Sequence, residues 1–332
     1  MPHLFGALKT AIDRERAPGR FLLKGSANVL LLPKLADSLA GRMGILRLCP
    51  LAQCEIARHT PNFLGRLFGA GFKVRRWDRL SHELAERITA GDYPAALRLP
   101  RGRRRARWYE SYLDTIGQRD VREFARINSR EALPRLLALA ASQTARLLNL
   151  SELAVPFSRS RPTIRDYVTL LARVFLLEEL QPWHTNRLSR HVKTPKLHLG
   201  DTGLACALLG ANAEALRADR GLLGQLLETF VFQGLKRQAS WHDDPFSFYH
   251  LRDRDGYEVD IVVERGARAV AGVEVKAGAT VTATDFRGLR KLKQAAGTRF
   301  TCGVVLYDGE TSAGFGDGLF AVPVRALWEP SE

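Results

Sequence analysis

Acidic and basic residues in two strand-like segments near the end of the chain could support metal-assisted hydrolysis. Asp260 lies in residues 257–263, and Glu274 and Lys276 lie in residues 271–276. Because side chains alternate along a strand, Glu274 and Lys276 point the same way. Two carboxylates can hold Mg²⁺ or Mn²⁺, and a lysine can orient or help deprotonate a water. The pattern indicates a phosphodiester-hydrolysing centre with Asp260 and Glu274 as metal ligands.

A third carboxylate, Glu228, lies on a helix expected over residues 221–238. It could add an oxygen ligand or hold a metal-bound water, so the candidate catalytic set is Glu228, Asp260, Glu274 and Lys276. The alternative is an internal salt-bridge cluster without a metal, because an unpaired charge inside a strand is costly.

The elements around these residues follow a definite order. After the helix, strands are expected at 246–251, 258–263 and 270–276, followed by a helix at 284–294 and strands at 303–307 and 319–322. This α-βββ-α-β order places secondary structure on both sides of the acidic residues.

Composition favours a polyanionic partner. The chain has 332 residues, 45% of them apolar, and a net charge of +15, so it can bury a core and suits nucleic acid or another anionic surface. The four cysteines form no CxxC pair and no zinc spacing, which fits a reducing compartment. We find neither a membrane-length apolar run nor a signal peptide, so we expect a cytoplasmic protein without a membrane partner.

In the first 80 residues, predicted helices and strands alternate as in a parallel α/β sheet. The segment is too short to form a complete sheet of this kind. A helix is expected around residues 8–12, a strand at 21–23, a helix at 33–39 and a strand at 45–48. The sequence of residues 80–143 predicts a mostly helical region.

A basic run at residues 101–107 interrupts that helical region and precedes aromatic residues. Arginines beside aromatic rings can follow a phosphate backbone and stack on bases, so Arg103, Arg104 and Arg105 are candidate nucleic-acid contacts. The alternative is a solvated loop before a helix whose aromatic side chains face the core.

Residues 147–199 predict a helix-turn-helix followed by a wing. Ser160 can cap a helix in which Ile164, Val168 and Leu171 share one face. A recognition helix meets DNA near its N-terminus, which makes candidates of Arg159, Arg161, Thr163 and Arg165. Segments 174–180 and 196–199 would form the wing. A purely architectural winged helix is the alternative.

Several of these segments together resemble prokaryotic AAA+-type ATPases that end in domain of unknown function 4143. The similarity covers nearly the whole chain and runs through residues 18–23, 25–28, 38–42, 48–51, 91–94, 112, 119–120, 147–203, 257–263 and 273–276. The resemblance implies a PD-(D/E)XK nuclease-like C-terminal unit with Glu228, Asp260, Glu274 and Lys276 at the matching positions. It also implies that Asn28 is a nucleotide sensor and that Arg42 lies near the phosphates or a neighbouring subunit.

Two family motifs do not occur in this sequence. They are the phosphate-binding G-x-x-x-x-G-K-[ST] loop and the apolar strand that ends in Asp-Glu. Without them no lysine holds the phosphates of ATP, and no strand-end carboxylate holds the Mg²⁺ that accompanies them. The chain therefore resembles an N-terminally shortened member with a vestigial nucleotide site, in which ATP is the family's cofactor and hydrolysis is not expected.

The predicted fold class is α/β multidomain, divided into four units. They are a truncated AAA+ half with a partial α/β sheet at 1–80, a helical linker or lid at 81–145, a winged helix-turn-helix at 146–200, and a nuclease-like α/β domain at 201–332.

Three functions remain open on this division. The first is a DNA-associated protein with a nuclease-like domain, and the second is a Mg²⁺-dependent endonuclease acting on DNA or RNA. The third is a non-catalytic module for a separate ATPase subunit, with a homo-oligomer as a further possible assembly.

Overall fold

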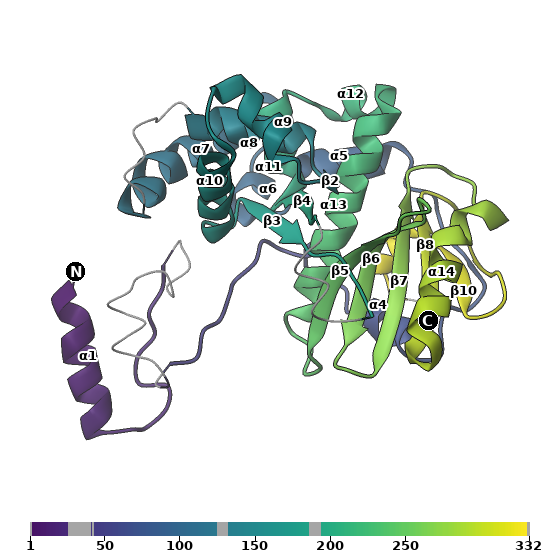
Figure 1. Ribbon diagram of the computed structural model, residues 1–332, viewed down its shortest axis with the longest axis horizontal. Coiled ribbons are helices and arrows are strands. Elements are labelled where there is room, and N and C mark those ends of the chain that lie inside the picture. The colour runs from purple at the N-terminus through teal and green to yellow at the C-terminus, as the bar shows by residue number, and fades with distance from the viewer. Residues whose placement is uncertain (1, 26–40, 42, 125–131, 186–193, 331–332) are drawn as a thin grey trace.

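The computed structural model describes residues 2–25, 41, 43–124, 132–185 and 194–330. Its principal helices lie at α1 (Pro2–Arg14), α5 (His82–Ala90), α7 (Arg103–Phe124), α8 (Ala132–Ser142), α10 (Arg161–Arg173), α11 (Thr202–Leu209), α13 (Arg220–Ala239) and α14 (Arg287–Ala296). Shorter ones lie at α3 (Gln53–Ala57), α4 (Phe63–Leu67), α6 (Pro94–Leu97), α9 (Leu150–Ala154) and α12 (Ala213–Ala218). Figure 1 shows the helical part beside a sheet-rich C-terminal part, with α13 between them.

A seven-stranded mixed sheet forms most of the C-terminal part, and one of its edge strands comes from Arg75–Arg76. Its order is β1-β9-β10-β8-β7-β6-β5, with β7, β8 and β10 parallel and the other pairs antiparallel. The strands are β1 (Arg75–Arg76), β5 (Phe246–Arg252), β6 (Glu258–Arg265), β7 (Ala269–Lys276), β8 (Phe300–Tyr307), β9 (Thr311–Gly314) and β10 (Leu319–Pro323). The structure confirms the predicted α-βββ-α-β order, and the two short strands β1 and β9 are additions that the sequence pattern missed.

A second sheet of three short strands follows the helices. β2 (Arg146–Leu147) and β3 (Leu177–Leu180) both pair antiparallel with the central β4 (Lys196–Leu199). Helices α9 and α10 lie between β2 and β3 in the chain, and the Ser160 hydroxyl accepts the Thr163 N–H as the predicted N-cap. The helical nature of residues 80–143 is also confirmed where the structure describes them.

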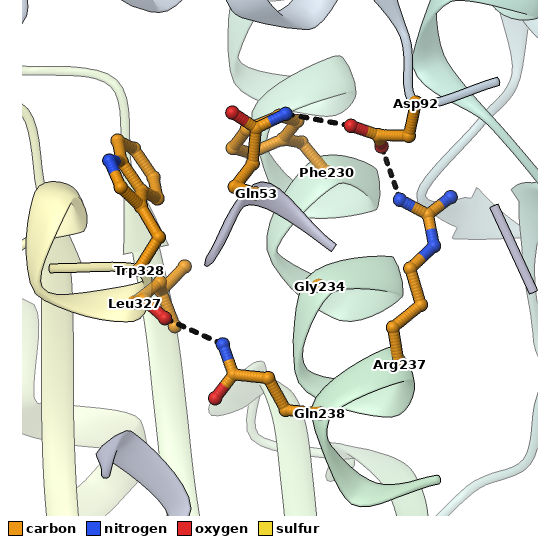
Figure 2. A pocket seen from close by; sticks show the side chains of 8 residues that line it. All are labelled: Gln53, Asp92, Phe230, Gly234, Arg237, Gln238, Leu327 and Trp328. Carbon is orange, nitrogen blue, oxygen red and sulfur yellow. Dashed lines mark hydrogen bonds and ion pairs between the residues drawn. The ribbon is translucent and has the colours of Figure 1, made fainter. Parts of the chain in front are cut away.

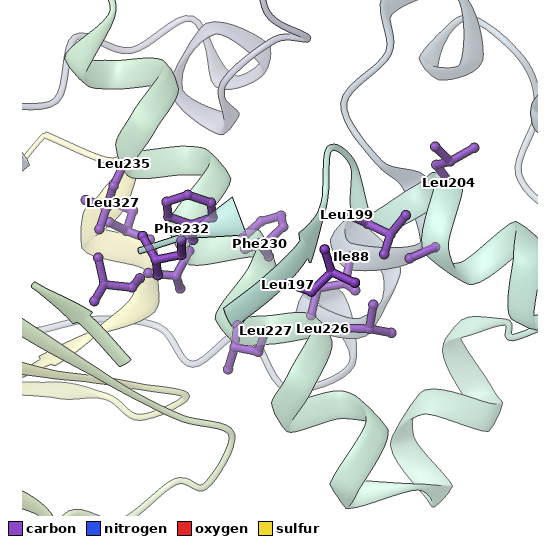
Figure 3. Close-up of a cluster of buried hydrophobic side chains, with 14 of the residues drawn as sticks. Ile88, Leu197, Leu199, Leu204, Leu226, Leu227, Phe230, Phe232, Leu235 and Leu327 are labelled. Atoms are coloured by element: carbon purple, nitrogen blue, oxygen red, sulfur yellow. The ribbon is translucent and has the colours of Figure 1, made fainter. Parts of the chain in front are cut away.

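One continuous apolar core joins the helical part to the sheet. Helix α13 is buried around most of its circumference, as expected of a central helix. Figure 3 shows leucine and phenylalanine side chains of α13 meeting those of α5, β4 and the C-terminal segment. A separate cluster, which includes Val262, Leu289 and Leu292, packs α14 onto the sheet. The β-sheet is therefore covered on both sides.

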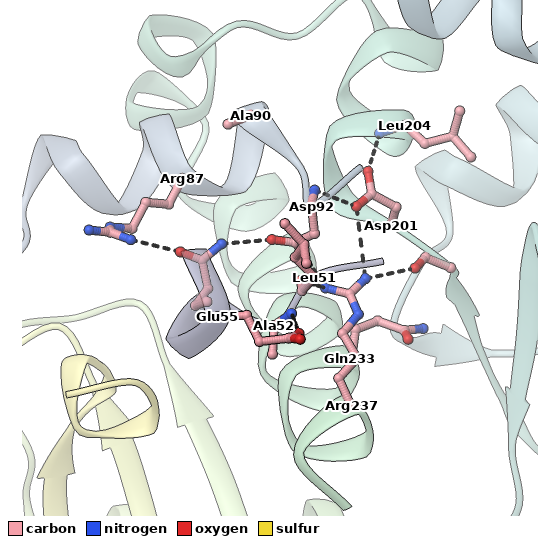
Figure 4. A network of polar contacts seen from close by, with 12 residues as sticks. Leu51, Ala52, Glu55, Arg87, Ala90, Asp92, Asp201, Leu204, Gln233 and Arg237 are labelled. Carbon is pink, nitrogen blue, oxygen red and sulfur yellow. Dashed lines mark hydrogen bonds and ion pairs between the residues drawn. The ribbon is translucent and has the colours of Figure 1, made fainter. Parts of the chain in front are cut away.

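A buried guanidinium crosses this core. Arg237 on α13 contacts Asp92 through Nη1, donates from Nη1 to the Leu51 carbonyl at 3.1 Å and from Nη2 to the Gly200 carbonyl at 3.2 Å. Asp201, whose Oδ2 lies 3.8 Å from Nη2, caps α11 and accepts the Asp92 N–H at 2.8 Å (Figure 4). Burial first, and then the charge of Asp92, raise the pKa of Asp201 to about 6, although Arg237 opposes this shift.

The neighbouring contacts extend this network toward the C-terminus. Gln53 donates to Asp92 at 2.7 Å, and Gln238 donates to the Leu327 carbonyl at 2.6 Å (Figure 2). Gly91 approaches so closely that an added Cβ would lie 2.4 Å from an Asp201 oxygen, and its φ is +63°. Glycine is therefore required at this turn.

The predicted N-terminal strands are wrong for the described residues. Residues 21–23 and 45–48 form no strand, and Leu22, Leu46 and Leu48 are almost fully exposed. A strand needs hydrogen-bonded neighbours, and the described part of the chain supplies none beside these segments. The helix expected at 33–39 lies outside the described residues. Among the helices that are described, none is long and apolar enough to cross a bilayer.

We expect Arg237→Met to destabilise the fold by about 3–5 kcal/mol, because it leaves the Asp92 and Asp201 carboxylates buried without a counter-charge. Urea unfolding monitored by fluorescence and circular dichroism measures the loss. The control is Arg76→Met, which removes an exposed ion pair with Glu310 and should cost less than about 1 kcal/mol. Equal losses in the two variants would contradict a central role for Arg237.

Candidate functional site

The acidic centre of the C-terminal part is built around a lysine from another element. Lys196, on β4 of the small sheet, places its Nζ 2.8 Å from Glu228 Oε1, 2.8 Å from Glu258 Oε1 and 3.1 Å from Asp260 Oδ1. Its side chain is 3% exposed. The ammonium donates hydrogen bonds to Glu228 and Asp260 and forms an ion pair with Glu258, so three carboxylates surround one cation.

The fork between β6 and β7 holds Asp260 in place. The ladder between the two strands ends at Ile261 and Val273, and beyond that point Asp260 Oδ2 accepts the Val275 N–H at 2.9 Å. Both oxygens of Asp260 therefore have partners, one on the strand and one on Lys196. Glu258 reaches the same ammonium from two residues earlier on β6.

Glu274 lies beside this centre without a hydrogen bond to it. Its Oε2 is buried and has no hydrogen-bond partner among the described residues. Burial first, and then the charge of Asp260, raise the pKa of Glu274 well above its ordinary value. The same two causes raise the pKa of Glu228. Burial lowers the pKa of Lys196, but the charges of Asp260, Glu228 and Glu258 overcome it, so that the pKa is raised and the ammonium stays charged.

Lys276 is not part of the centre. Its Nζ lies 2.6 Å from Asp285 Oδ2, on the short helical turn before α14. Burial opposes the shift, but hydrogen bonds from Lys276 and Thr282 lower the pKa of Asp285. The structure thus brings together Glu228, Asp260 and Glu274, while Lys276 is held by a partner on another element.

Sequence reasoning missed four polar residues here: Lys196, Glu258, His198 and His250. A signal was available for two of them. Residues 196–199 alternate polar and apolar side chains, which places Lys196 and His198 on one face of the strand. Leu197 and Leu199 on the other face enter the main core. The side-chain partners of that polar face lie 31 or more residues further along the chain, so no local sequence pattern identifies them.

Two histidines lie next to the lysine and are neutral. His198 is fully buried, with Nδ1 3.0 Å from the Thr229 hydroxyl and Nε2 3.9 Å from Glu228 Oε1. Burial, and then the charge of Lys196, lower the pKa of His198 well below its ordinary value and that of His250 to about 4.

These side chains do not fit a divalent ion in this arrangement, because the ammonium already takes the oxygens that would be its ligands. Among the residues that the structure describes, no group of three His, Cys, Asp or Glu side chains is placed to hold a metal ion. The centre is a buried cluster of acidic side chains whose cation is the Lys196 ammonium group.

The predicted nucleic-acid residues fall into two groups. Arg103, Arg104, Arg159 and Arg161 are exposed. The others, Arg105, Arg165 and Thr163, are engaged in the fold. The arginines from Arg103 onward lie in the first turns of α7, so the loop of the alternative interpretation is limited to residues 101–102.

The three engaged residues have internal partners. Arg105 donates to the carbonyls of Ala96 and Leu99 at 3.1 and 2.9 Å. Arg165 contacts Glu179 at 2.7 Å, and the Thr163 hydroxyl lies 2.9 Å from that of Ser160. The aromatic rings after the basic run also pack inward, since Trp108 stacks on Tyr112 with centroids 5.1 Å apart. Asn28 and Arg42, the predicted nucleotide contacts, lie outside the described residues.

Three protein-family models match parts of the chain. An AAA domain model matches residues 1–57, a Domain of unknown function (DUF8612) matches 81–215, and a Domain of unknown function (DUF4143) matches 223–327. These matches confirm the expected combination of an AAA domain near the N-terminus with domain 4143 near the C-terminus. The residues of the acidic centre on α13, β6 and β7 all fall within the last match.

Two uncharacterized mycobacterial proteins are similar along almost the whole chain. They are Mb2031c of Mycobacterium bovis and Rv2008c of Mycobacterium tuberculosis, each 26% identical over 327 residues, which is 98% of this chain and 67% of the relative. A solved assembly of Thermococcus gammatolerans McrB AAA+ hexamers with bound McrC is a more distant match. It is 12% identical with a TM-score of 0.25, covering 57% of this chain and 70% of that chain.

Lowering the pH should destabilise the fold, because His250 then becomes protonated. The unfolded histidine takes up a proton near pH 6.5, whereas the buried one does so at about pH 4, so its contribution is present above pH 6.5 and is lost as the pH falls to about 4. The shift corresponds to at most roughly 3 kcal/mol. We therefore expect the stability advantage of wild type over His250→Phe to shrink by up to this amount between pH 7 and pH 4.

Urea unfolding across that pH range measures this difference. Leu251→Ala is the control, because it removes buried apolar atoms of the adjacent residue and no titrating group. The difference in the free energy of unfolding between Leu251→Ala and wild type should not change with pH as His250 becomes protonated. If the difference in the free energy of unfolding between wild type and His250→Phe stays constant with pH, His250 is not a neutral, buried histidine.

Proposed function

We propose that this chain is a DNA-associated protein that binds duplex DNA through the N-terminus of α10. The exposed Arg159 and Arg161 flank Ser160 at the start of this helix and support the proposal most directly. The first N–H groups of a helix attract anions, and two exposed guanidinium groups beside them add charge and hydrogen-bond donors for phosphate.

The surrounding elements favour the same surface. Helix α9 precedes α10, and the antiparallel strands β3 and β4 follow it, which is the element order of a winged helix. Arg165 is held against Glu179 on β3, so it fixes the helix on the sheet and is not a free DNA contact. Ile164, Val168 and Leu171 are buried, so the apolar face is turned inward and the arginines lie at the exposed end.

The basic start of α7 is a second candidate contact. Arg103 and Arg104 are exposed, whereas Arg105 holds the carbonyls of Ala96 and Leu99 at the end of α6. We assign a secondary role to the exposed arginines of α7, because the aromatic rings that follow them pack on Tyr93 and do not form an open stacking surface.

The C-terminal unit is proposed to be nuclease-like in fold and to take part in binding or assembly, not cleavage. The α-βββ-α-β order supports the first part, and the lysine within the acidic centre supports the second. Because the sequence contains no G-x-x-x-x-G-K-[ST] loop, we propose no ATP hydrolysis by these 332 residues alone. A separate ATPase subunit or a second copy of the chain is the proposed protein partner.

Fluorescence anisotropy of a labelled duplex of about 20 base pairs, which is two turns of B-DNA, tests the DNA proposal. We expect binding that weakens steeply with salt, because each neutralised phosphate releases counterions. The Arg159→Ala/Arg161→Ala variant should reduce the slope of log K against log salt by about 2, since each phosphate neutralised by an arginine contributes roughly 0.9 to that slope.

The matched control removes the same charge elsewhere. Arg254 and Arg268 are exposed on the C-terminal unit, and Arg254→Ala/Arg268→Ala should leave the slope nearly unchanged. Binding that is absent, that does not depend on salt, or that falls equally in the two double variants would refute α10 as the DNA-binding element.

A further inference from the structure

Lys196 takes the position in the acidic centre at which a metal ion would bind. Glu228 comes from α13, Glu258 and Asp260 come from β6, and their oxygens meet at the ammonium within 3.1 Å. The ammonium donates hydrogen bonds to Glu228 and Asp260 and pairs with the charge of Glu258, so three carboxylates are directed at one cation. The side chain enters from β4, whose backbone is fixed by β2 and β3 on either side, so this is not a surface lysine that has folded back.

The distances between the carboxylate oxygens and the ammonium nitrogen are close to those that a divalent metal ion requires. Hard divalent ions bind carboxylate oxygens at about 2.0–2.1 Å for Mg²⁺ and about 2.3–2.6 Å for Ca²⁺. The oxygens now lie 2.8 to 3.1 Å from the nitrogen, so movements of about half an ångström would bring them to Ca²⁺ distance, and larger ones, of up to about 1 Å, to a smaller divalent ion. With the ammonium present, a second cation would be repelled and would find its ligands occupied.

Besides Nδ1 of His250, two buried atoms beside the centre have no hydrogen-bond partner among the described residues, and both suit a metal. They are Glu274 Oε2 and Nε2 of the fully buried His198, the latter 3.9 Å from Glu228 Oε1. Carboxylate oxygens are the ordinary ligands of Mn²⁺, and a neutral imidazole nitrogen is an ordinary ligand of divalent transition metals. Buried polar atoms are seldom left unpaired, so these two indicate a site with more ligands than the single ammonium uses.

We propose that Lys196 is a built-in cation that replaces a divalent metal ion, and that removing its charge turns the cluster of Glu228, Glu258, Asp260 and Glu274 into a site for such an ion. The wild-type chain then binds no divalent ion here. The inference concerns the same C-terminal unit as the proposed function, but it does not depend on DNA binding.

Lys196→Met tests it, because methionine keeps the apolar stem and ends one atom short of the ammonium position. The probe is Mn²⁺ alone, with free Mn²⁺ measured by electron paramagnetic resonance and thermal unfolding measured with and without the ion. We expect one Mn²⁺ per Lys196→Met chain, an affinity at least about tenfold higher than that of wild type, and a rise in Tm that only this variant shows.

Lys276→Met is the matched control. It removes a lysine from the same unit, but one that contacts Asp285 instead of the cluster, so it should bind no more Mn²⁺ than wild type. A Lys196→Met chain that folds in Mn²⁺ but not without it would also support the proposal, since the ion then replaces the missing charge.

If Lys196→Met does not fold in either condition, Lys196→Met/Glu228→Gln lowers the uncompensated charge and keeps the oxygens of Glu258, Asp260 and Glu274. The same Mn²⁺ binding is expected of it. The proposal is overturned if wild type binds Mn²⁺ as tightly as the lysine-free chain, if neither lysine-free variant folds and binds the ion, or if Lys276→Met gains the same site.

Discussion

Helix α13 must accommodate charged side chains within the core of the molecule, and the arrangement of its neighbours follows from that constraint. Arg237 near its C-terminal end holds Asp92, Asp201 and two backbone carbonyls, and Glu228 near its middle meets Lys196. A buried charge without partners is strongly destabilising, so each contact fixes an element from a distant part of the chain. The helical part, the small sheet and the large sheet are tied to one helix.

The two charge sites on α13 differ in their balance. At Arg237 one cation meets two carboxylates, and its two terminal nitrogens also donate to backbone carbonyls. At Lys196 one cation meets three carboxylates with a fourth beside them, and the pKa values of Glu228 and Glu274 are raised as a result of burial and crowding. At the first site, one cation holds together elements from distant parts of the chain. The second has an excess of acid ligands, which is the property expected of a site suited to a more highly charged ion.

The exposed basic residues lie on a different element from this centre. Arg159 and Arg161 extend from the start of α10, while β4, two elements later, carries Lys196 into the acidic cluster. The small sheet therefore joins the proposed DNA-binding helix to the acidic centre, because α10 packs on β3 and β3 pairs with β4. Lys196 thus ties the small sheet to the C-terminal unit.

The sequence alone determined the strand and helix order of the last third, the Ser160 cap, and the acidic residues Glu228, Asp260 and Glu274, because periodicity, capping and charge within strands are local properties. It did not determine which lysine those acids would meet. Lys276 is near them in sequence and shares a strand face with Glu274, yet Asp285 holds it, whereas Lys196 comes from another sheet. Only the tertiary structure determined which lysine pairs with these acids. Ion pairing depends on distance in space, and no local pattern encodes a contact between residues 64 positions apart.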